Sequence, residues 1–190
     1  QAGSNLTTGG TNTVVGYQAL QSATTATHNV AAGYQAMQGI PSGTSVVGCV
    51  AIGKDAFKGS GSTTTGASYT IAIGLDALEA LTTGARNVAM GYTAAKALTI
   101  GDDNIAIGYA AMGLLSTADN SDKNIAIGNY AMDGVSTLAA THNIFIGYGS
   151  GGGSWTGTAS AQNVAIGNYT MDAAMDDASN NVAVGYLAMS

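Results

Sequence analysis

A short motif that recurs along the whole chain is the feature that most constrains its fold. Near copies of Asn-Val-Ala-Ile-Gly, as found at residues 163–167, follow one another about every 19 residues. A unit this short buries too little apolar surface to fold alone, so the copies are expected to stack. We interpret residues 1–190 as one array of about ten coils within a longer fibrous chain, because neither end carries a polar capping unit. We number the repeats 1 to 10 by their motif glycines, which are Gly16, Gly33, Gly53, Gly74, Gly91, Gly108, Gly128, Gly147, Gly167 and Gly185.

Each motif predicts a short strand that ends in a bend. The residues before the glycine alternate large, small, large, as in Ile105-Ala106-Ile107, and many are β-branched. After the glycine the chain continues Tyr-x-Ala-Leu/Met, with apolar residues three apart, which favours a short helical turn over a second strand. Loops rich in Thr, Ser, Gly, Asp and Asn complete each repeat. The fold class is therefore a mainly β repeat protein, a parallel β-solenoid or β-roll.

Stacking is expected to join the Val/Ile positions into one continuous core, so that Ile107→Asp would unfold the central coils. Asn stands four residues before the motif glycine in most repeats, with Cys49 and Thr70 as the exceptions. The Asn side chains are expected to be structural, either as an amide-to-amide ladder or as bend residues that hold loop backbone. The proposed structural ladder consists of Asn12, Asn29, Asn87, Asn104, Asn124, Asn143, Asn163 and Asn181.

The residue just before each Asn is often long and polar, which indicates a position that faces water. Arg86, Asp103 and Lys123 occupy it in consecutive repeats and could alternate in charge. His28 and His142 share the same position far apart in the chain, so no metal pair is expected. Acidic residues gather in loops, but no known calcium-loop pattern matches them. A calcium ion at Asp119 to Asp122 therefore stays an alternative to a solvated loop.

Repeat 8 departs most from the pattern. Phe145 replaces the usual small residue of the strand, and a glycine-rich stretch, Gly149 to Ser154, follows Tyr148 and leads to Trp155. A phosphate-binding loop is rejected, because no Gly-Lys-Ser/Thr follows. Trp155 and Tyr148 could form a surface that binds a glycan or a partner chain, on a projecting loop that could be deleted without loss of stability. Alternatively, Trp155 folds back over Phe145 and fills a widened coil.

Composition argues against several classes of function. The net charge is −6 and the five basic residues form no patch, so nucleic acid is not an expected partner. No apolar run approaches the length of a membrane span. The single cysteine, Cys49, is expected to be a buried thiol. We expect no catalytic residues, no metal site and no cofactor, because no set of residues suggests a reaction.

The Asn-Val-Ala-Ile-Gly copies resemble the head repeats of trimeric (YadA-like) autotransporter adhesins. The fuller pattern, Gly-Tyr-Gln-Ala-Leu with Thr-Thr-Gly connections such as residues 82–84, is similar to repeats in bacteriophage tail fibres. The resemblance implies a homotrimeric, rod-like fibre that is extracellular, on a virion tail or a bacterial cell surface, with a glycan or receptor as partner. The period here is longer than in the adhesin heads. The column of small residues, such as Ala72 and Ala106, would let three sheets approach one another.

The first functional hypothesis is thus a structural fibre segment of a phage tail fibre or surface adhesin that holds or forms part of a receptor-binding rod. Recognition would lie on outward loops such as Lys58 to Tyr69. The rival is a monomeric secreted solenoid that binds a repetitive ligand, a polysaccharide or ice, along one face. That function needs a regular ladder of Thr or aromatic residues, and the Tyr column is interrupted by Lys54, Leu75, Asn129 and Asn168. An enzyme is a distant third.

Overall fold

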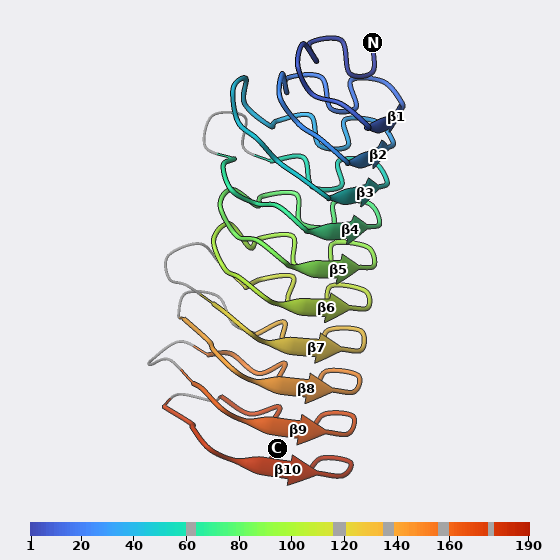
Figure 1. Cartoon of the computed structure of the whole chain (residues 1–190). Helices are drawn as coiled ribbons and strands as arrows, with labels where there is room; N and C mark the ends of the chain where they lie inside the picture. Colours follow the sequence, from blue (N-terminus) through green and yellow to red (C-terminus); the bar gives the residue numbers. More distant parts are fainter. Residues whose placement is uncertain (60–63, 116–120, 135–138, 156–159, 175–176) are drawn as a thin grey trace.

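The chain folds as a parallel β-solenoid. The computed structural model describes residues 1–59, 64–115, 121–134, 139–155, 160–174 and 177–190. Short strands stack in chain order into one parallel sheet, spaced about 19 residues apart along the chain, in about eight turns (Figure 1). The strands are β1 (Thr13–Val15), β2 (Val30–Ala32), β3 (Val50–Ile52), β4 (Ile71–Ile73), β5 (Val88–Met90), β6 (Ile105–Ile107), β7 (Ile125–Ile127), β8 (Ile144–Ile146), β9 (Val164–Ile166) and β10 (Val182–Val184). The predicted strand of each repeat and the parallel stacking are confirmed.

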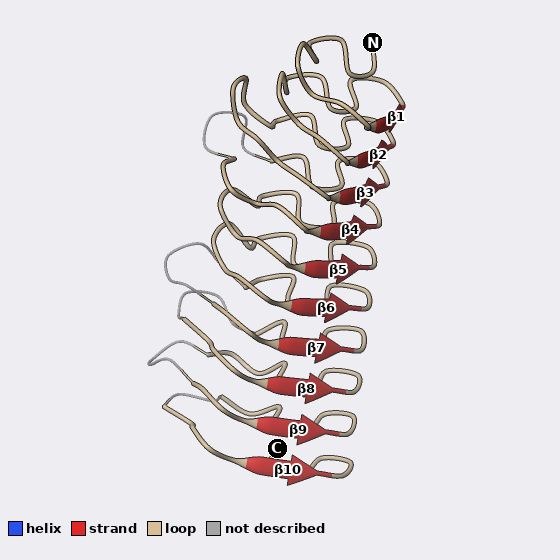
Figure 2. Ribbon diagram, in the orientation of Figure 1, coloured by secondary structure: helices blue, strands red, loops and turns tan. Residues whose placement is uncertain are grey.

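Equivalent residues of neighbouring repeats lie directly over one another. The central strand residues Ala31 and Ala51 are partners across β2 and β3, and Ala89 and Ala106 are partners across β5 and β6. This register holds although the repeats differ in length. The strands stand in one column along one side of the described solenoid (Figure 2). Differences in repeat length are therefore absorbed in the connections and do not shift the ladder.

The motif glycines form a column in which the backbones of successive repeats approach closely. Gly33 has a φ of 144°, and a Cβ placed on it would collide with the carbonyl group of Gly53. Gly74 meets Gly91, and Gly108 meets Gly128, in the same way. Only glycine offers both this backbone conformation and the absence of a side chain. The glycine of the motif is thus required by the stacking itself.

The segment after the glycine is a turn, and the predicted helical turn is wrong. None of the described residues is helical. Gln35 and Met37 have φ values of 56° and 54°, which a right-handed helix excludes. Their N–H groups bond to neighbouring repeats: Gln35 donates to the carbonyl of Tyr17 at 2.8 Å, and Met37 donates to that of Ala56 at 3.1 Å. Bonding between repeats therefore replaces bonding within a turn of helix.

The core is built from alanines opposite larger residues, and the expected Val/Ile core is wrong. In each strand only the central residue points inward, so Ala106 is buried while Ile105 and Ile107 are only half-buried. The inward alanines share the core with the residue four positions after each motif glycine, which is Leu or Met in most repeats, such as the fully buried Met112. The Ala column therefore packs inside its own chain and cannot be the place where separate sheets meet. The reason is strand alternation, which puts both flanking residues on the outer face.

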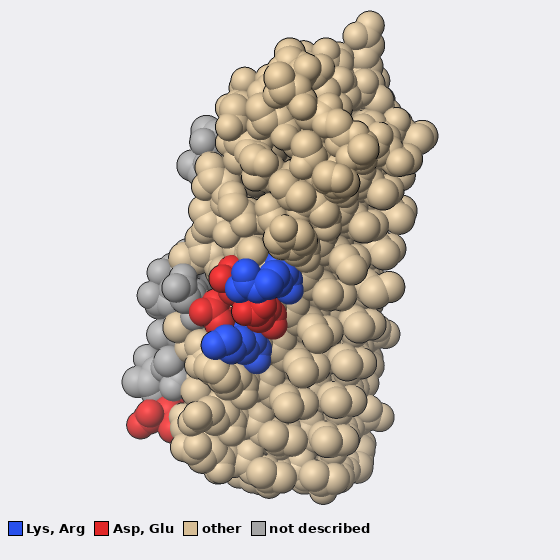
Figure 3. All heavy atoms as spheres, in the orientation of Figure 1, with Lys and Arg blue, Asp and Glu red and all other residues tan. Residues whose placement is uncertain are grey.

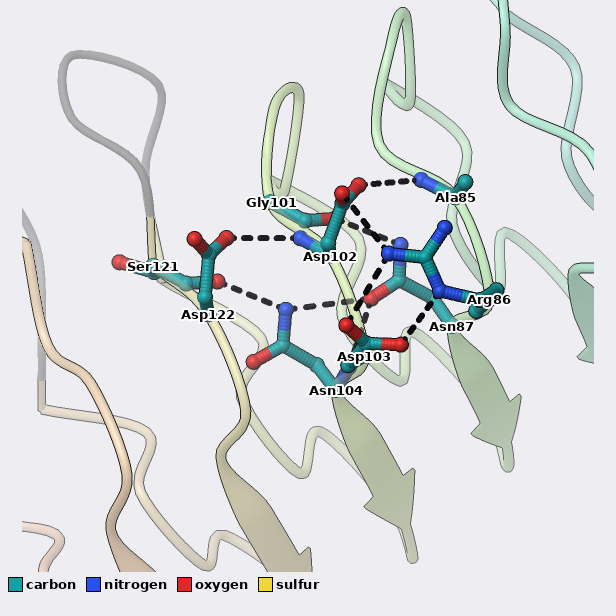
Figure 4. Close-up of polar contacts among 9 residues, drawn as sticks. All are labelled: Ala85, Arg86, Asn87, Gly101, Asp102, Asp103, Asn104, Ser121 and Asp122. Carbon is teal, nitrogen blue, oxygen red and sulfur yellow. Dashed lines mark hydrogen bonds and ion pairs between the residues drawn. The ribbon is translucent and has the colours of Figure 1, made fainter.

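The Asn column forms a buried ladder of amides, which was the first of its two expected roles. Asn87 Oδ1 accepts two bonds from Asn104, from the backbone N–H at 2.9 Å and from Nδ2 at 3.1 Å. The Nδ2 groups also hold loop carbonyls: Asn87 donates to Gly101 and Asn104 to Ser121, both at 2.7 Å (Figure 4). Every Asn of the column except Asn181 therefore fills both expected roles at once, because it joins two repeats and fixes a bend.

Cys49 and Thr70, which replace Asn in repeats 3 and 4, mark the weakest part of this ladder. Cys49 is buried and lies in line with the Asn column, because its backbone N–H donates to Asn29 Oδ1 at 2.8 Å. Its Sγ lies 3.3 Å from the carbonyl of Ala67, where an amide would otherwise donate. Burial raises the pKa of Cys49 to about 11, which confirms a buried thiol that stays protonated at neutral pH. Among the described residues, none bonds to the buried Oγ1 of Thr70.

Replacing one ladder amide should destabilise the stack locally. We expect Asn163→Ala to lower the free energy of unfolding by about 2 to 3 kcal/mol, because the N–H of Asn181 and the carbonyl of Ala178 lose their buried partner. Chemical denaturation followed by circular dichroism measures this. The exposed neighbour provides the control: Gln162→Ala should change stability by less than about 0.5 kcal/mol. Equal effects of the two substitutions would contradict a structural role for the ladder.

Candidate functional site

The described residues do not assemble the groups that a metal site needs. No cluster of three or more His, Cys, Asp or Glu side chains occurs among them. His28 and His142 are exposed at the polar position before the Asn ladder. No helix in this part of the chain is long and apolar enough to cross a bilayer. Asp119 and Asn120 of the acidic loop lie outside the described residues, as do residues 60–63 of the loop from Lys58 to Tyr69.

One cluster of charges lies on the face shown in Figure 3, most of which is otherwise uncharged. Arg86 Nε lies 2.6 Å from Asp103 Oδ1, and Arg86 NH2 lies 3.0 Å from Asp102 Oδ2 (Figure 4). The guanidinium group holds the pKa of Asp103 below its usual range, and Lys123 adds to the effect. The expected alternation of charge is therefore present. Its groups are solvent-exposed, so it contributes little to stability.

An apolar feature of the described surface is the strand face. We use this name for the outward residues of β1 to β10, the first and third residue of each strand. Val15, Ile52, Met90 and Ile127 are each more than a third exposed, and Val184 is exposed by 67%. These residues recur in every strand, so the apolar rows run the length of the described solenoid. Continuous exposed apolar surface of this kind marks an interaction site more often than a solvated face.

A ladder of stacked tyrosines follows the bend beside the strand face. Ring centroids of neighbours lie 5.1 to 6.3 Å apart, and every member is more than a third exposed. The tyrosine ladder consists of Tyr92, Tyr109, Tyr130, Tyr148, Tyr169 and Tyr186. The expectation that Asn129 and Asn168 interrupt the column is wrong. Tyr17 and Tyr34 form a separate stacked pair, so the interruption at Lys54 and Leu75 remains.

The tyrosine ladder is continuous because Asn129 and Asn168 are each followed by a tyrosine, whose ring occupies the place in the ladder that the Asn leaves open. In repeats 7 and 9 the sequence Gly-Asn-Tyr replaces Gly-Tyr, and the rings of Tyr130 and Tyr169 still reach the column. The Asn side chains turn toward the backbone. Asn129 Oδ1 accepts the N–H of Tyr109 at 2.9 Å, and Asn168 Oδ1 accepts that of Tyr148 at 2.9 Å. The pairing of Asn with a following Tyr was the signal in the sequence.

The structure separates the two residues that were expected to form a binding surface. Tyr148 is exposed within the ladder, but Trp155 is only 1% exposed and belongs to the core. The indole packs edge to face on Phe145, with ring centroids 5.5 Å apart. Trp155 as a surface binding residue is therefore wrong, and the alternative, in which it covers Phe145, is confirmed.

The glycine-rich stretch of repeat 8 belongs to the coil and does not project from it. Ser150 and Gly151 are buried, and Ser150 Oγ donates to the carbonyl of Ala165 at 3.3 Å. A Cβ on Gly151 would lie 2.7 Å from the ring of Phe145. Gly151 stands where most other repeats have Leu or Met, with Phe57 and Ala95 as the exceptions, so in repeat 8 the large and small residues have exchanged sides. Deletion of this stretch would therefore remove core.

The exchange can be tested with a double-mutant cycle. Phe145→Ala should cost about 3 to 5 kcal/mol through the cavity it leaves, and Gly151→Met should also destabilise, because its side chain would overlap the Phe145 ring. The double variant restores the pattern of the other repeats and should be more stable than the sum predicts by at least about 2 kcal/mol. Denaturant titrations of all four proteins measure the coupling. Additive effects would show that the two positions do not share one space.

Comparisons with protein-family models, with curated proteins and with solved structures found no match. The likeness to adhesin heads and tail-fibre repeats therefore rests on the repeated motif alone. The structural features that bear on function are the strand face and the tyrosine ladder, together with the pattern of repeats that produces them.

Proposed function

We propose that this chain is a structural fibre segment of a phage tail fibre or bacterial surface adhesin. In this role three copies associate into an extracellular rod that holds, or forms part of, a receptor-binding assembly. The segment comprises ten coils of one repeat array. The role is mechanical and includes no catalysis, and its outer partner is a cell-surface glycan or receptor. The single observation that carries the proposal is the strand face.

A second copy of the same chain suits this surface better than an unrelated partner. The apolar rows repeat at the spacing of the strands, with the same register from β1 to β10. A partner that covers them along their length must present apolar groups at the same spacing, and another array of these repeats does so. Self-association through equivalent surfaces is also the commonest form of protein assembly. The number three follows from the resemblance to trimeric adhesins.

The strand residues offer a matched pair of substitutions on opposite sides of one strand. Ile107→Asp should leave the coil folded, because Ile107 points outward, but should break the association by placing like charges together. Ala106→Asp should unfold the central repeats, because Ala106 is buried. Light scattering gives the mass, which for the unaltered chain should be near three times 18.7 kDa, and circular dichroism gives the fold.

A stable, folded monomer of the unaltered chain would sink the trimer proposal. Unfolding by Ile107→Asp as complete as that by Ala106→Asp would instead contradict the outward placement of Ile107.

The tyrosine ladder favours one alternative function, a solenoid that binds a polysaccharide along one face. The ladder is unbroken from Tyr92 to Tyr186, and tyrosine combines an apolar ring with a polar tip. On this alternative the chain would be monomeric. It would also sediment with an insoluble polysaccharide and lose that binding on Tyr109→Ala.

A further inference from the structure

A hollow lies at the turn of repeat 8. Gly149 and Gly152 stand in repeat 8 where repeat 7 has Tyr130 and Asp133 and repeat 9 has Tyr169 and Asp172. These glycines border a gap beside the side chains of repeats 7 and 9, and the Tyr169 ring lies 3.2 Å from the position that a Cβ on Gly149 would take. This gap is a pocket of about 350 Å³, and we call it the repeat 8 pocket. It is lined by Tyr130, Asp133, Tyr148, Gly149, Gly152, Tyr169 and Asp172.

Three tyrosine rings form the apolar part of this pocket. The ring of Tyr148 lies between the other two, and its centroid is 5.7 Å from that of Tyr130 and 5.3 Å from that of Tyr169. Its plane is inclined to theirs by 71° and 64°. The three rings line one side of the pocket, which is largely open to solvent. The face of an aromatic ring carries partial negative charge and attracts a cation.

The remaining side chains of the pocket are two carboxylates. Asp172 Oδ1 leans toward the backbone of repeat 8, where it lies 3.3 Å from the position that a Cβ on Gly152 would take. Burial raises the pKa of Asp133, although the N–H groups of Leu114 and Gly113 oppose the rise. None of the lining residues is basic. The carboxylates of this pocket therefore have no positive side chain among its walls.

These features together select the charge and the size of a ligand. A neutral sugar would use the rings but would leave the negative charge unbalanced. A metal ion would need more oxygen ligands than two carboxylates supply, and it gains little from aromatic walls. An alkylated ammonium group matches both parts, because its carbon surface packs on the rings while its charge faces the carboxylate of Asp172; the carboxylate of Asp133 lies against the backbone of Gly113 and Leu114 in repeat 6 and acts from farther away. A volume of this size also lies at the lower end of the range of small-molecule sites.

We propose that the repeat 8 pocket binds an organic ammonium group, either the quaternary head of a choline or the primary ammonium of an alkyl chain such as a lysine side chain. The pocket lies on the turns that follow the motif glycines and contains no strand residue, so the site does not depend on the proposed association through the strand face.

Titrations of the whole chain with three probes test this site. Choline and n-butylammonium are the two cations, and 3,3-dimethylbutan-1-ol is the neutral analogue of choline. We expect at least one cation to bind with a dissociation constant on the order of 1 mM, and the neutral analogue to bind at least about tenfold more weakly. Chemical-shift changes in the NMR signals of Tyr148 and Gly149 locate the binding. The cation that binds more tightly identifies the source of the ligand.

Matched substitutions distinguish binding in the pocket from attraction by the overall negative charge of the chain. Asp172→Asn should weaken cation binding about tenfold, whereas Asp103→Asn removes the same charge from an exposed position elsewhere and should leave binding unchanged. Tyr148→Leu should weaken binding, and Tyr17→Leu, in the separate stacked pair, should not.

A second design fills the pocket while keeping the fold. Gly149→Gln introduces the residue that repeats 1 and 2 carry at the same position, where Gln18 and Gln35 adopt the same positive φ. A Cβ at this position would lie 3.2 Å from the Tyr169 ring, which must shift by a few tenths of an ångström to admit it. This variant should lose cation binding, and circular dichroism checks that it stays folded. The proposal is overturned if neither cation binds at about 10 mM, if the neutral analogue or methyl glucoside binds as tightly, or if filling the pocket has no effect. These readouts do not depend on the mass of the assembly, so they can fail or succeed separately from the fibre proposal.

Discussion

The close contact between motif glycines is the constraint on which the rest of the structure depends. Each glycine packs its backbone against the carbonyl group of the next one, and no side chain fits between them. Once these backbones are in contact, the neighbouring positions must also stack: the strand residues pair in register, and the Asn amides come within hydrogen-bond distance of one another. The amides and the strands then satisfy polar groups that a single repeat would leave unpaired.

Sequence patterns predicted this stacking because they record which positions repeat. The strand, the motif glycine and the Asn ladder all follow from period alone. The same patterns did not show which side of the strand faces inward. Large-small-large alternation is compatible with either orientation, and only the partner across the narrow coil decides between them. Met112 fills the space opposite Ala106, so the small residue is inside and the isoleucines are outside.

The tyrosine ladder and repeat 8 escaped prediction for a related reason. Reading the column position by position makes Asn129 an interruption, whereas a ring on Tyr130 can reach the same space. In repeat 8, Phe145 and Gly151 each look anomalous alone, but together they conserve the volume of the core. In both cases the same space is filled in each repeat, but either of two sequence positions can supply the side chain that fills it. Two other glycines of the same turn, Gly149 and Gly152, border the pocket between repeats 7 and 9.

The unequal lengths of the repeats have a consequence for how such a chain can change. Connections of different length join strands that keep the same register, so an inserted loop residue adds nothing to the height of the stack. Height changes only when a whole repeat is gained or lost, by a step of about 4.8 Å. The length of the solenoid can therefore change only in steps of one repeat, whereas the lengths of the connections can vary without changing it.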